Sequence, residues 1–256
     1  MASIVRRYGI EIVSLCSALV IWQLAADYVV KNPTFLPSVT DVFTSFCRLR
    51  GDLVYDAEIS LLHFGIGVAA GMCVAIPLGI SMGWFPLTNR IFNPIIEILR
   101  PIPPLAWIPF AIIWLGLTHA AAGSIVFLGA VFPILINTYM GFRNVPKVLI
   151  ETAMVLGCTR NYDLIRKVAF PSAVPDIVTG IRVGMGVGWM CVVAAEMFGA
   201  STSGIGYKIQ FWGHLHRMDH VMVYMLLLGF IALIIDSLFR YFVEQRLSRW
   251  RKGIVA

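Results

Sequence analysis

The chain has 256 residues, of which 59% are hydrophobic and only 13% are charged, and its mean hydropathy is +0.82. A water-soluble fold of this length could not cover so much apolar surface, so the composition excludes a soluble globular protein and indicates an integral membrane protein. The net charge is +6. In a membrane protein an excess of Lys and Arg usually marks cytoplasmic loops, and we expect no nucleic-acid partner.

Six apolar segments are long enough to cross a bilayer as helices of about twenty residues each. They cover about 10–30, 59–84, 92–116, 121–141, 176–199 and 221–243. The first is longer than the apolar core of a secretory signal, which is about 7–15 residues, so we predict an uncleaved span. The sequence therefore predicts an all-α polytopic membrane protein with about six transmembrane helices and no second domain.

The segment after the first span predicts a short amphipathic helix that starts near Pro37. Ser38 or Thr40 would cap it, and its apolar side would hold Val42, Phe43 and Phe46. Such a helix would lie along the membrane surface rather than cross it. We accordingly expect three regions: 1–55 with the first span and the surface helix, 56–245 with a core of five spans, and a basic tail at 246–256.

Small residues recur every four positions in two spans, which places them on one face of each helix. They are Gly67, Gly71, Ala75, Gly79 and Gly83 in the second span and Gly180, Gly184 and Gly188 in the fifth. Such faces let two helix backbones approach closely in lipid. The pattern predicts tight packing within one chain. As an alternative, the fifth span lines a subunit interface or a moving pathway wall.

The third span contains a dense group of prolines after Arg100. Pro101, Pro103 and Pro104 precede Trp107 and remove the amide donors that a continuous helix needs. Broken backbone at membrane depth persists only where it is buried in protein or lines a water-filled cavity. We interpret the segment as a partly unwound element beside a translocation route. The alternative is a re-entrant turn at the cytoplasmic interface with no transport role.

Charged side chains in the spans are costly and usually face protein or a cavity. Glu196 lies near the outer end of the fifth span and is interpreted either as an outer gate or pathway group or as a structural hydrogen-bond acceptor. For Asp236, in the sixth span, we favour a structural role. We favour one for Glu97 as well, because it stands three residues before Arg100, at the helical spacing of an ion pair.

Histidines and cysteines give little support for a metal or a cofactor. His214, His216 and His220 follow one another in an outer loop beside Asp219, but their spacing does not place them on one helical face. The five cysteines never form a CxxC pair. His63 and His119 stand alone in the sequence and are interpreted as helix-end residues. We expect no metal, no cofactor and no catalytic site.

Residues 143–175 predict a loop that is built as helix, break and helix between the fourth and fifth spans. Val148, Ile150 and Leu156 are apolar, and Gly157 permits a sharp turn. A solvated connector has no need of an apolar helical face. The loop is therefore predicted to project from the membrane and insert into a groove of a soluble partner.

Lys and Arg are distributed unevenly between the two sides of the predicted spans. With the N-terminus inside, most of the 20 Lys and Arg residues are cytoplasmic. Arg100 is ambiguous, and the outer side receives only Lys31, Arg48, Arg50, Lys208 and Arg217. By the positive-inside rule, both termini and the loop 143–175 are predicted to be cytoplasmic.

The loop resembles the EAA motif of the membrane subunits of ABC importers, the binding-protein-dependent permeases. Glu151, Thr152, Ala153 and Gly157 match the head of that motif, and Phe170-Pro171 match its tail. Two departures are present. Thr152 stands where Ala is usual, and the distance from Gly157 to Pro171 is one residue longer than expected. The resemblance implies that this loop docks on an ATP-binding subunit.

Further segments are similar to the branch that handles nitrate, taurine, aliphatic sulfonates and bicarbonate. They are Leu36-Pro37-Ser38, the run from Arg100 to Trp107, Phe132-Pro133-Ile134 with Asn137-Thr138, Gly180 to Gly184 with Trp189, and Val193 to Met197. The resemblance implies a homodimeric pore of type I importer fold in an inner membrane, in contact with lipid. It also implies two ATPase subunits and an extracytoplasmic solute-binding protein.

No Walker-type phosphate loop occurs in the chain, so ATP hydrolysis is expected on a separate subunit. In the membrane, Arg100 and Arg182 could meet an oxyanion, although both could equally be anchors at the cytoplasmic interface. We favour a sulfonate or taurine-like anion as the solute. The alternative is an ATP-independent channel or secondary transporter, which would predict inverted repeats and paired charges at the midplane.

Overall fold

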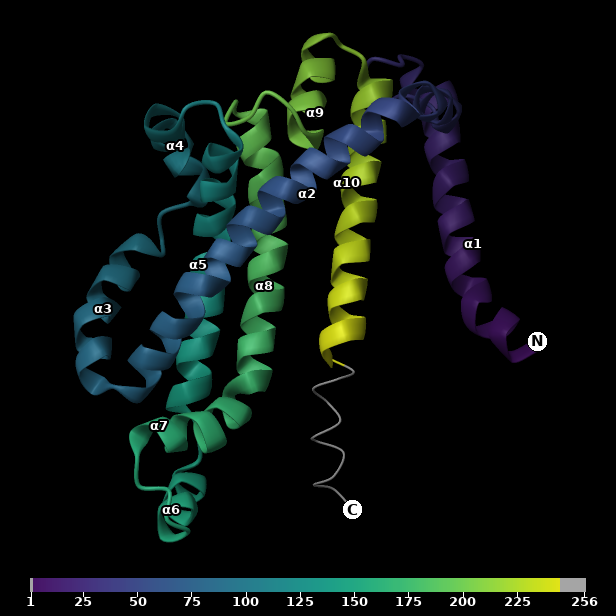
Figure 1. The fold of residues 1–256 in the computed structure, drawn as a ribbon. Helices are drawn as coiled ribbons and strands as arrows, with labels where there is room; N and C mark the ends of the chain where they lie inside the picture. The colour runs from purple at the N-terminus through teal and green to yellow at the C-terminus, as the bar shows by residue number, and fades with distance from the viewer. Residues whose placement is uncertain (1, 245–256) are drawn as a thin grey trace.

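The computed structural model describes residues 2–244, which contain helices and no strand (Figure 1). The predicted basic tail at 246–256 lies outside this range. The α-helices are α1 (Ala2–Leu24), α2 (Val39–Trp84), α3 (Pro86–Leu99), α4 (Ile108–Leu115), α5 (His119–Arg143), α6 (Lys147–Val155), α7 (Asn161–Leu164), α8 (Phe170–Met197), α9 (Ile205–His214) and α10 (Met218–Phe239). Shorter π-helical turns cover Ala25–Val30, Ile165–Ala169 and Arg240–Glu244, and a 3-10 turn covers Pro104–Trp107.

The predicted all-α polytopic architecture is confirmed. Among the described residues, five helices are long and apolar enough to cross a membrane, and a sixth span results if α3 and α4 are counted together. The helix axes on the two sides of the proline segment are bent by 87°. The segment predicted as a proline-containing span at 92–116 is therefore part of a bent pair of helices. The predicted break is present, because Pro101 and Pro103 lie between helices and Pro104 starts a 3-10 turn.

The amphipathic segment near Pro37 is not a separate surface helix. Ser38 caps α2, since its Oγ accepts from the Asp41 N–H and the Asp41 carboxylate accepts from the Ser38 N–H. From there α2 continues without interruption for 46 residues, a length of about 69 Å at 1.5 Å per residue. Nothing between Val39 and Pro77 breaks it, so the expected boundary at 55/56 falls inside one helix that crosses the molecule obliquely (Figure 1).

Helices α2, α5 and α8 form the core of the molecule. Its centre is filled by side chains of α5 that are fully buried, namely Ile125, Val126, Ala130 and Ile134. The glycine faces of α2 and α8 both pack on α5. A Cβ atom on Gly67 would lie 2.6 Å from the Gly123 carbonyl oxygen, and one on Gly184 would lie 2.8 Å from Ile134 Cγ1. The small residues thus permit close helix contact within one chain.

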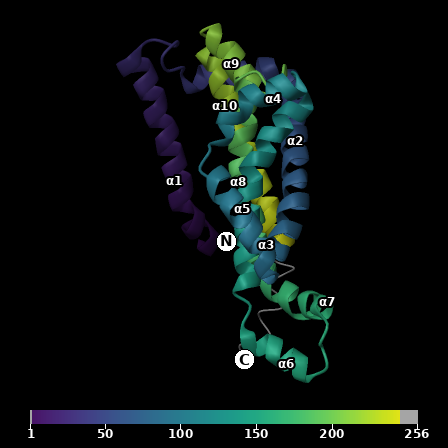
Figure 2. The same ribbon diagram turned by 90° about the vertical axis from the view of Figure 1, so that its left-hand side faces the viewer.

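Helix α1 stands apart from this core in both views (Figures 1 and 2). It is joined to the rest of the chain at one end only, where Trp22 Nε1 donates to the Pro37 carbonyl at 3.1 Å and Gln23 Oε1 accepts from the Val39 N–H at 2.9 Å. Most of its described side chains are exposed, including Val13 and Leu15. In one copy of the chain this helix therefore has an uncovered apolar surface.

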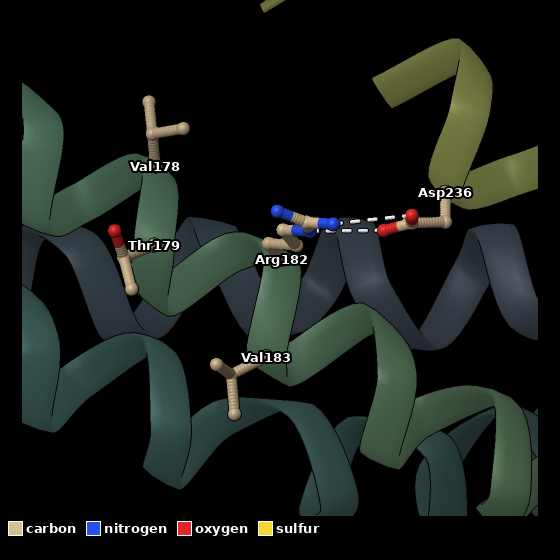
Figure 3. Close-up of a pocket in the computed structure, with 5 residues that line it drawn as sticks. All are labelled: Val178, Thr179, Arg182, Val183 and Asp236. Atoms are coloured by element: carbon tan, nitrogen blue, oxygen red, sulfur yellow. Dashed lines mark hydrogen bonds and ion pairs between the residues drawn. The ribbon is translucent and has the colours of Figure 1, made fainter. Parts of the chain in front are cut away.

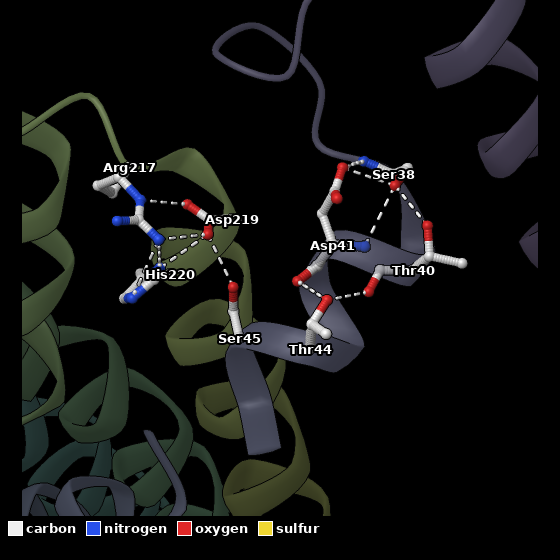
Figure 4. A network of polar contacts seen from close by, with 8 residues as sticks. All are labelled: Ser38, Thr40, Asp41, Thr44, Ser45, Arg217, Asp219 and His220. Carbon is white, nitrogen blue, oxygen red and sulfur yellow. Dashed lines mark hydrogen bonds and ion pairs between the residues drawn. The ribbon is translucent and has the colours of Figure 1, made fainter. Parts of the chain in front are cut away.

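A row of buried polar side chains on α2 contacts α8, α9 and α10. Ser45 donates to Asp219 at 2.7 Å, and Tyr224 donates to Asp56 at 2.8 Å. Asp219 also accepts from Arg217 and contacts His220 (Figure 4). The hydrogen bond from Arg217 to Asp219 raises the pKa of this guanidinium. These contacts fasten the first half of α2 to the start of α10.

Candidate functional site

The predicted coupling loop projects beyond the end of the core (Figures 1 and 2). Helix α6 ends in a Schellman motif, in which the Cys158 N–H donates to the Ala153 carbonyl at 2.9 Å and the Gly157 N–H donates to the Met154 carbonyl at 3.0 Å. Gly157 has a φ of +93°, which side chains other than glycine rarely adopt. The predicted sequence of helix, break and helix is confirmed, and the glycine is required by its backbone conformation.

The loop carries apolar side chains that no other part of the described chain covers. Val155 is 87% exposed, Leu156 is 81% exposed and Val148 is 69% exposed. Glu151 and Thr152 are exposed as well, whereas Ala153 is buried. The Thr152 hydroxyl donates to the Val148 carbonyl at 2.7 Å, so the substitution of the usual Ala leaves α6 intact.

The tail of the motif lies at the start of α8. Phe170 is the first residue of α8, Pro171 follows it, and both are exposed. The ring of Phe170 lies 6.5 Å from that of Phe142 on α5, measured between centroids. The π-helical turn Ile165–Ala169 leads directly into α8, and the Phe170 N–H donates to the Ile165 carbonyl, while Pro171 has no N–H to donate. Head and tail of the motif therefore flank one solvent-facing loop.

The residues predicted to line the pathway do not form a single cluster in the described part of the chain. Arg100 is exposed at the end of α3, and Pro101 and Pro103 are exposed after it. Trp107 is half-buried and packs against the core. The expected ion pair between Glu97 and Arg100 is absent from the described contacts. Glu97 accepts instead from Asn93 Nδ2 at 2.7 Å.

Arg182 points from α8 toward α10 and forms a two-point ion pair with Asp236 (Figure 3). Its Nε lies 2.9 Å from Oδ1 and its Nη2 lies 3.1 Å from Oδ2. Arg240 adds a contact of 3.1 Å to the same carboxylate. The pair borders a cavity of about 430 Å³ that is also lined by Val178, Thr179 and Val183. The structural role expected for Asp236 matches this geometry.

Glu196 is fully buried and is held by partners on α2 and α9. His63 Nδ1 lies 2.7 Å from Oε1, and Ser60 Oγ lies 2.9 Å from both carboxylate oxygens. The Gly206 N–H donates to Oε2 at 2.8 Å. In this conformation Glu196 faces protein rather than an open passage. This geometry matches the structural hydrogen-bond acceptor, which was one of the two interpretations from the sequence.

His63 and His119 are not isolated, contrary to the expectation from sequence. His63 Nε2 lies 2.8 Å from His119 Nδ1, so the two rings and Glu196 form one chain of hydrogen bonds. Two glycines make room for the carboxylate. A Cβ on Gly204 would lie 2.5 Å from Glu196 Oε2, and one on Gly206 would lie 2.9 Å from Glu196 Cβ. Sequence spacing offered one signal: Asp56, Ser60 and His63 share a helix face.

We expect Glu196→Gln to lower the free energy of unfolding by about 2–3 kcal/mol, because a charged acceptor with several buried donors is replaced by a neutral amide. Amide hydrogen exchange at 204–214 should rise, since the start of α9 loses its acceptor. Glu97→Gln is the matched control, because Glu97 is exposed. Equal exchange at 204–214 in the two variants would contradict this role.

The outer histidines are used in other contacts. His220 Nδ1 lies 2.9 Å from Asp219 Oδ2, and its ring lies 4.4 Å from that of Trp212. His214 and His216 are exposed. Among residues 2–244 no group of three or more His, Cys, Asp or Glu side chains has the arrangement of a metal site.

Comparison with known proteins relates this geometry to one family. Residues 75–251 match the family model for the binding-protein-dependent transport system inner membrane component. The chain is 44% identical to a Methanocaldococcus jannaschii protein named as an ABC transporter permease, over 92% of this chain and 89% of that protein. It is 32% identical to the taurine transport system permease protein of Escherichia coli K12, over 96% and 90%.

The nitrate import permease protein of Synechocystis sp. is 30% identical, over 91% of this chain and 86% of that protein. The match covers the broken helix pair, the projecting loop and α8 to α10 together. The chain therefore belongs to the binding-protein-dependent inner membrane components, the multi-pass, non-enzymatic permease subunits of ABC importers that act with a separate ATPase and a solute-binding protein.

Proposed function

We propose that two copies of this chain form the translocation pathway for a small anionic solute and that an ATPase subunit docks on α6. The observation that carries the docking site is the exposed apolar surface of the loop, with Val155 and Leu156 more than four-fifths exposed beside the turn at Gly157. Apolar side chains that protrude into water at the tip of a short helix are typical of a protein interface. Glu151, Thr152, Ala153, Phe170 and Pro171 complete the docking loop.

A pathway between two copies is supported by the packing of one copy. The centre of α2, α5 and α8 is filled by fully buried side chains, so it offers no passage through a single bundle. Helix α3 presents an exposed apolar stripe at helical spacing, formed by Leu87, Ile91, Ile95 and Ile98. This stripe and α1 are surfaces for the second copy or for lipid. The bent segment with Arg100, Pro101, Pro103, Pro104 and Trp107 would border the pathway between the copies.

The orientation of the chain in the membrane follows from the proposed docking of an ATPase on α6. The projecting loop must reach an ATPase in the cytoplasm. This places the start of α1 and the end of α10 on the cytoplasmic side, because in Figure 1 both point toward the end of the molecule that carries α6 and α7. The start of α5 and helix α9 then face the outside. This arrangement agrees with the distribution of Lys and Arg.

A solute with a sulfonate or similar anionic group is supported by relatives named for taurine and nitrate transport. Arg182 and Thr179 line the cavity of about 430 Å³ and could meet such a group. The guanidinium already pairs with Asp236, so solute would have to compete for it, and we assign the main selectivity to the binding protein.

Reconstituted vesicles test the proposal. Uptake of radiolabelled taurine should require this chain, the ATPase, the binding protein and ATP. Vesicles without the ATPase should remain at background, because the chain carries no nucleotide site of its own. Filling of vesicles that lack the ATPase would contradict the proposal and favour a channel or a secondary transporter.

A further inference from the structure

Two of the hydrogen bonds to the Glu196 carboxylate, those from Ser60 and Gly206, have a defined donor. The Ile205 N–H donates to Ser60 Oγ at 2.9 Å, which leaves the single hydroxyl proton of Ser60 for the Glu196 carboxylate. The Gly206 N–H donates to the same carboxylate. Both groups donate to the carboxylate in this arrangement, and an ionised carboxylate can accept both. The side that can change is the one formed by the two histidines.

His63 and His119 form two hydrogen bonds in series, and each bond holds one proton. One joins Glu196 to His63 Nδ1, and the other joins His63 Nε2 to His119 Nδ1. With one proton in each bond, both rings are neutral and the group of Glu196, His63 and His119 has a net charge of −1. His119 Nε2 is the one ring nitrogen left over, and His119 is exposed.

A proton that binds to His119 Nε2 makes the group neutral. The charge can then move inward: the Nδ1–H bond of His119 breaks as an Nε2–H bond forms on His63, which becomes an imidazolium beside the carboxylate. In total, one N–H bond has broken at His119 Nδ1 and two have formed, at His119 Nε2 and at His63 Nε2. The extra proton comes from water. Imidazole is suited to this, because it gains and loses a proton near neutral pH.

Because the site is buried, the charge that the proton neutralises is energetically costly. His63 and Glu196 have no exposed surface, and an enclosed net charge without a partner is costly. The surrounding elements carry further titratable side chains, among them Asp52 and Asp56 on α2, Tyr224 on α10 and Lys208 on α9. Tyr224 donates a hydrogen bond to Asp56, and the positive charge of Lys208 interacts electrostatically with the same carboxylate. In the described residues no basic side chain other than His63 forms an ion pair with Glu196.

We propose that Glu196, His63 and His119 form a proton-binding site that is entered through His119 and that holds the start of α9 in place. The site lies at the end of the molecule opposite α6, where α5 begins and α9 lies (Figure 1). Which compartment supplies the proton rests on the proposed function, by which this end faces the outside. The existence of the site does not depend on it.

The test measures the melting temperature of the purified full-length protein, without ATPase or binding protein, at about pH 6 and about pH 8. The parent protein should gain stability relative to His119→Gln as the pH falls from about 8 to about 6, because the enclosed negative charge holds the added proton more tightly than the unfolded chain does. The proton that His63 binds in the unfolded chain cancels in this comparison. In His119→Gln the side-chain amide nitrogen cannot take up a proton. This variant should match the parent at about pH 8 and lose the gain at about pH 6.

Two further variants complete the experiment. His214→Gln, at the exposed end of α9, should keep the full difference between the two pH values. Glu196→Gln should lose it, because no buried carboxylate remains to be neutralised. An unchanged difference in His119→Gln overturns the proposal, and so does an equal destabilisation at both pH values, which would make His119 a packing residue only. Since no transport is measured, these outcomes leave the proposed function untouched.

Discussion

Replacing Leu156 with aspartate is expected to abolish stable binding of the ATPase subunit and ATP-dependent uptake. Leu156 is 81% exposed and follows α6 directly, next to the turn at Gly157. An apolar side chain at the centre of an interface commonly contributes 2 kcal/mol or more, which corresponds to a loss of affinity of about 30-fold. A buried, unpaired carboxylate in its place adds a desolvation cost. Co-purification and vesicle uptake measure the effect.

The folded state of this variant should be unchanged, because the side chain has almost no contacts within its own chain. Leu215→Asp is the matched control. Leu215 is 53% exposed and follows α9, at the opposite end of the molecule. It should lose neither ATPase binding nor stability. Retained co-purification in Leu156→Asp would show that the ATPase docks elsewhere.

Replacing Gly67 with leucine is expected to prevent accumulation of folded protein. A Cβ atom there would lie 2.6 Å from both the Gly123 carbonyl oxygen and Val126 Cγ1. One of these atoms is backbone, so a side-chain rotation cannot relieve the clash, and α2 and α5 would have to separate along their glycine contact. Overpacking in a well-filled core costs about 1–3 kcal/mol or more for each added group. A monodisperse peak in size-exclusion chromatography, with its melting temperature, is the measurement.

Gly65→Leu is the control, two residues away on the same helix. A Cβ at Gly65 meets nothing within 4 Å. Both substitutions change helix propensity alike, so the difference between them isolates the packing term. Equal yields and melting temperatures for the two variants would show that α2 and α5 are not held by this contact.

Some features of the protein were fixed by local physics and could be predicted. Spans at 121–141 and 221–243 agree with α5 and α10 to within a few residues at both ends, and the span at 59–84 agrees with α2 at its C-terminal end only. The agreement is expected because a run of apolar residues in lipid has few options other than a helix. The break after Arg100 and the turn at Gly157 were also predicted, since proline and glycine act on their own backbone.

Other features depended on contacts between distant segments. A capped helix start at Ser38 and an apolar span from 59 were both visible, but the sequence between them did not show that α2 is continuous. The chain of Glu196, His63 and His119 joins α8, α2 and α5 across more than 50 positions in the sequence. No local pattern pairs them, so His63 and His119 were interpreted as isolated.

By itself, the sequence determined that this is a helical membrane protein with a projecting loop, since hydrophobicity and the backbone preferences of Pro and Gly act locally. The tertiary structure decided the partners of the polar groups in the spans: Arg182 pairs with the partly exposed Asp236, and the buried Glu196 pairs with Ser60, His63 and Gly206. The physical reason is that a charge in a low-dielectric interior must find its partner in three dimensions, and that partner can lie anywhere along the chain.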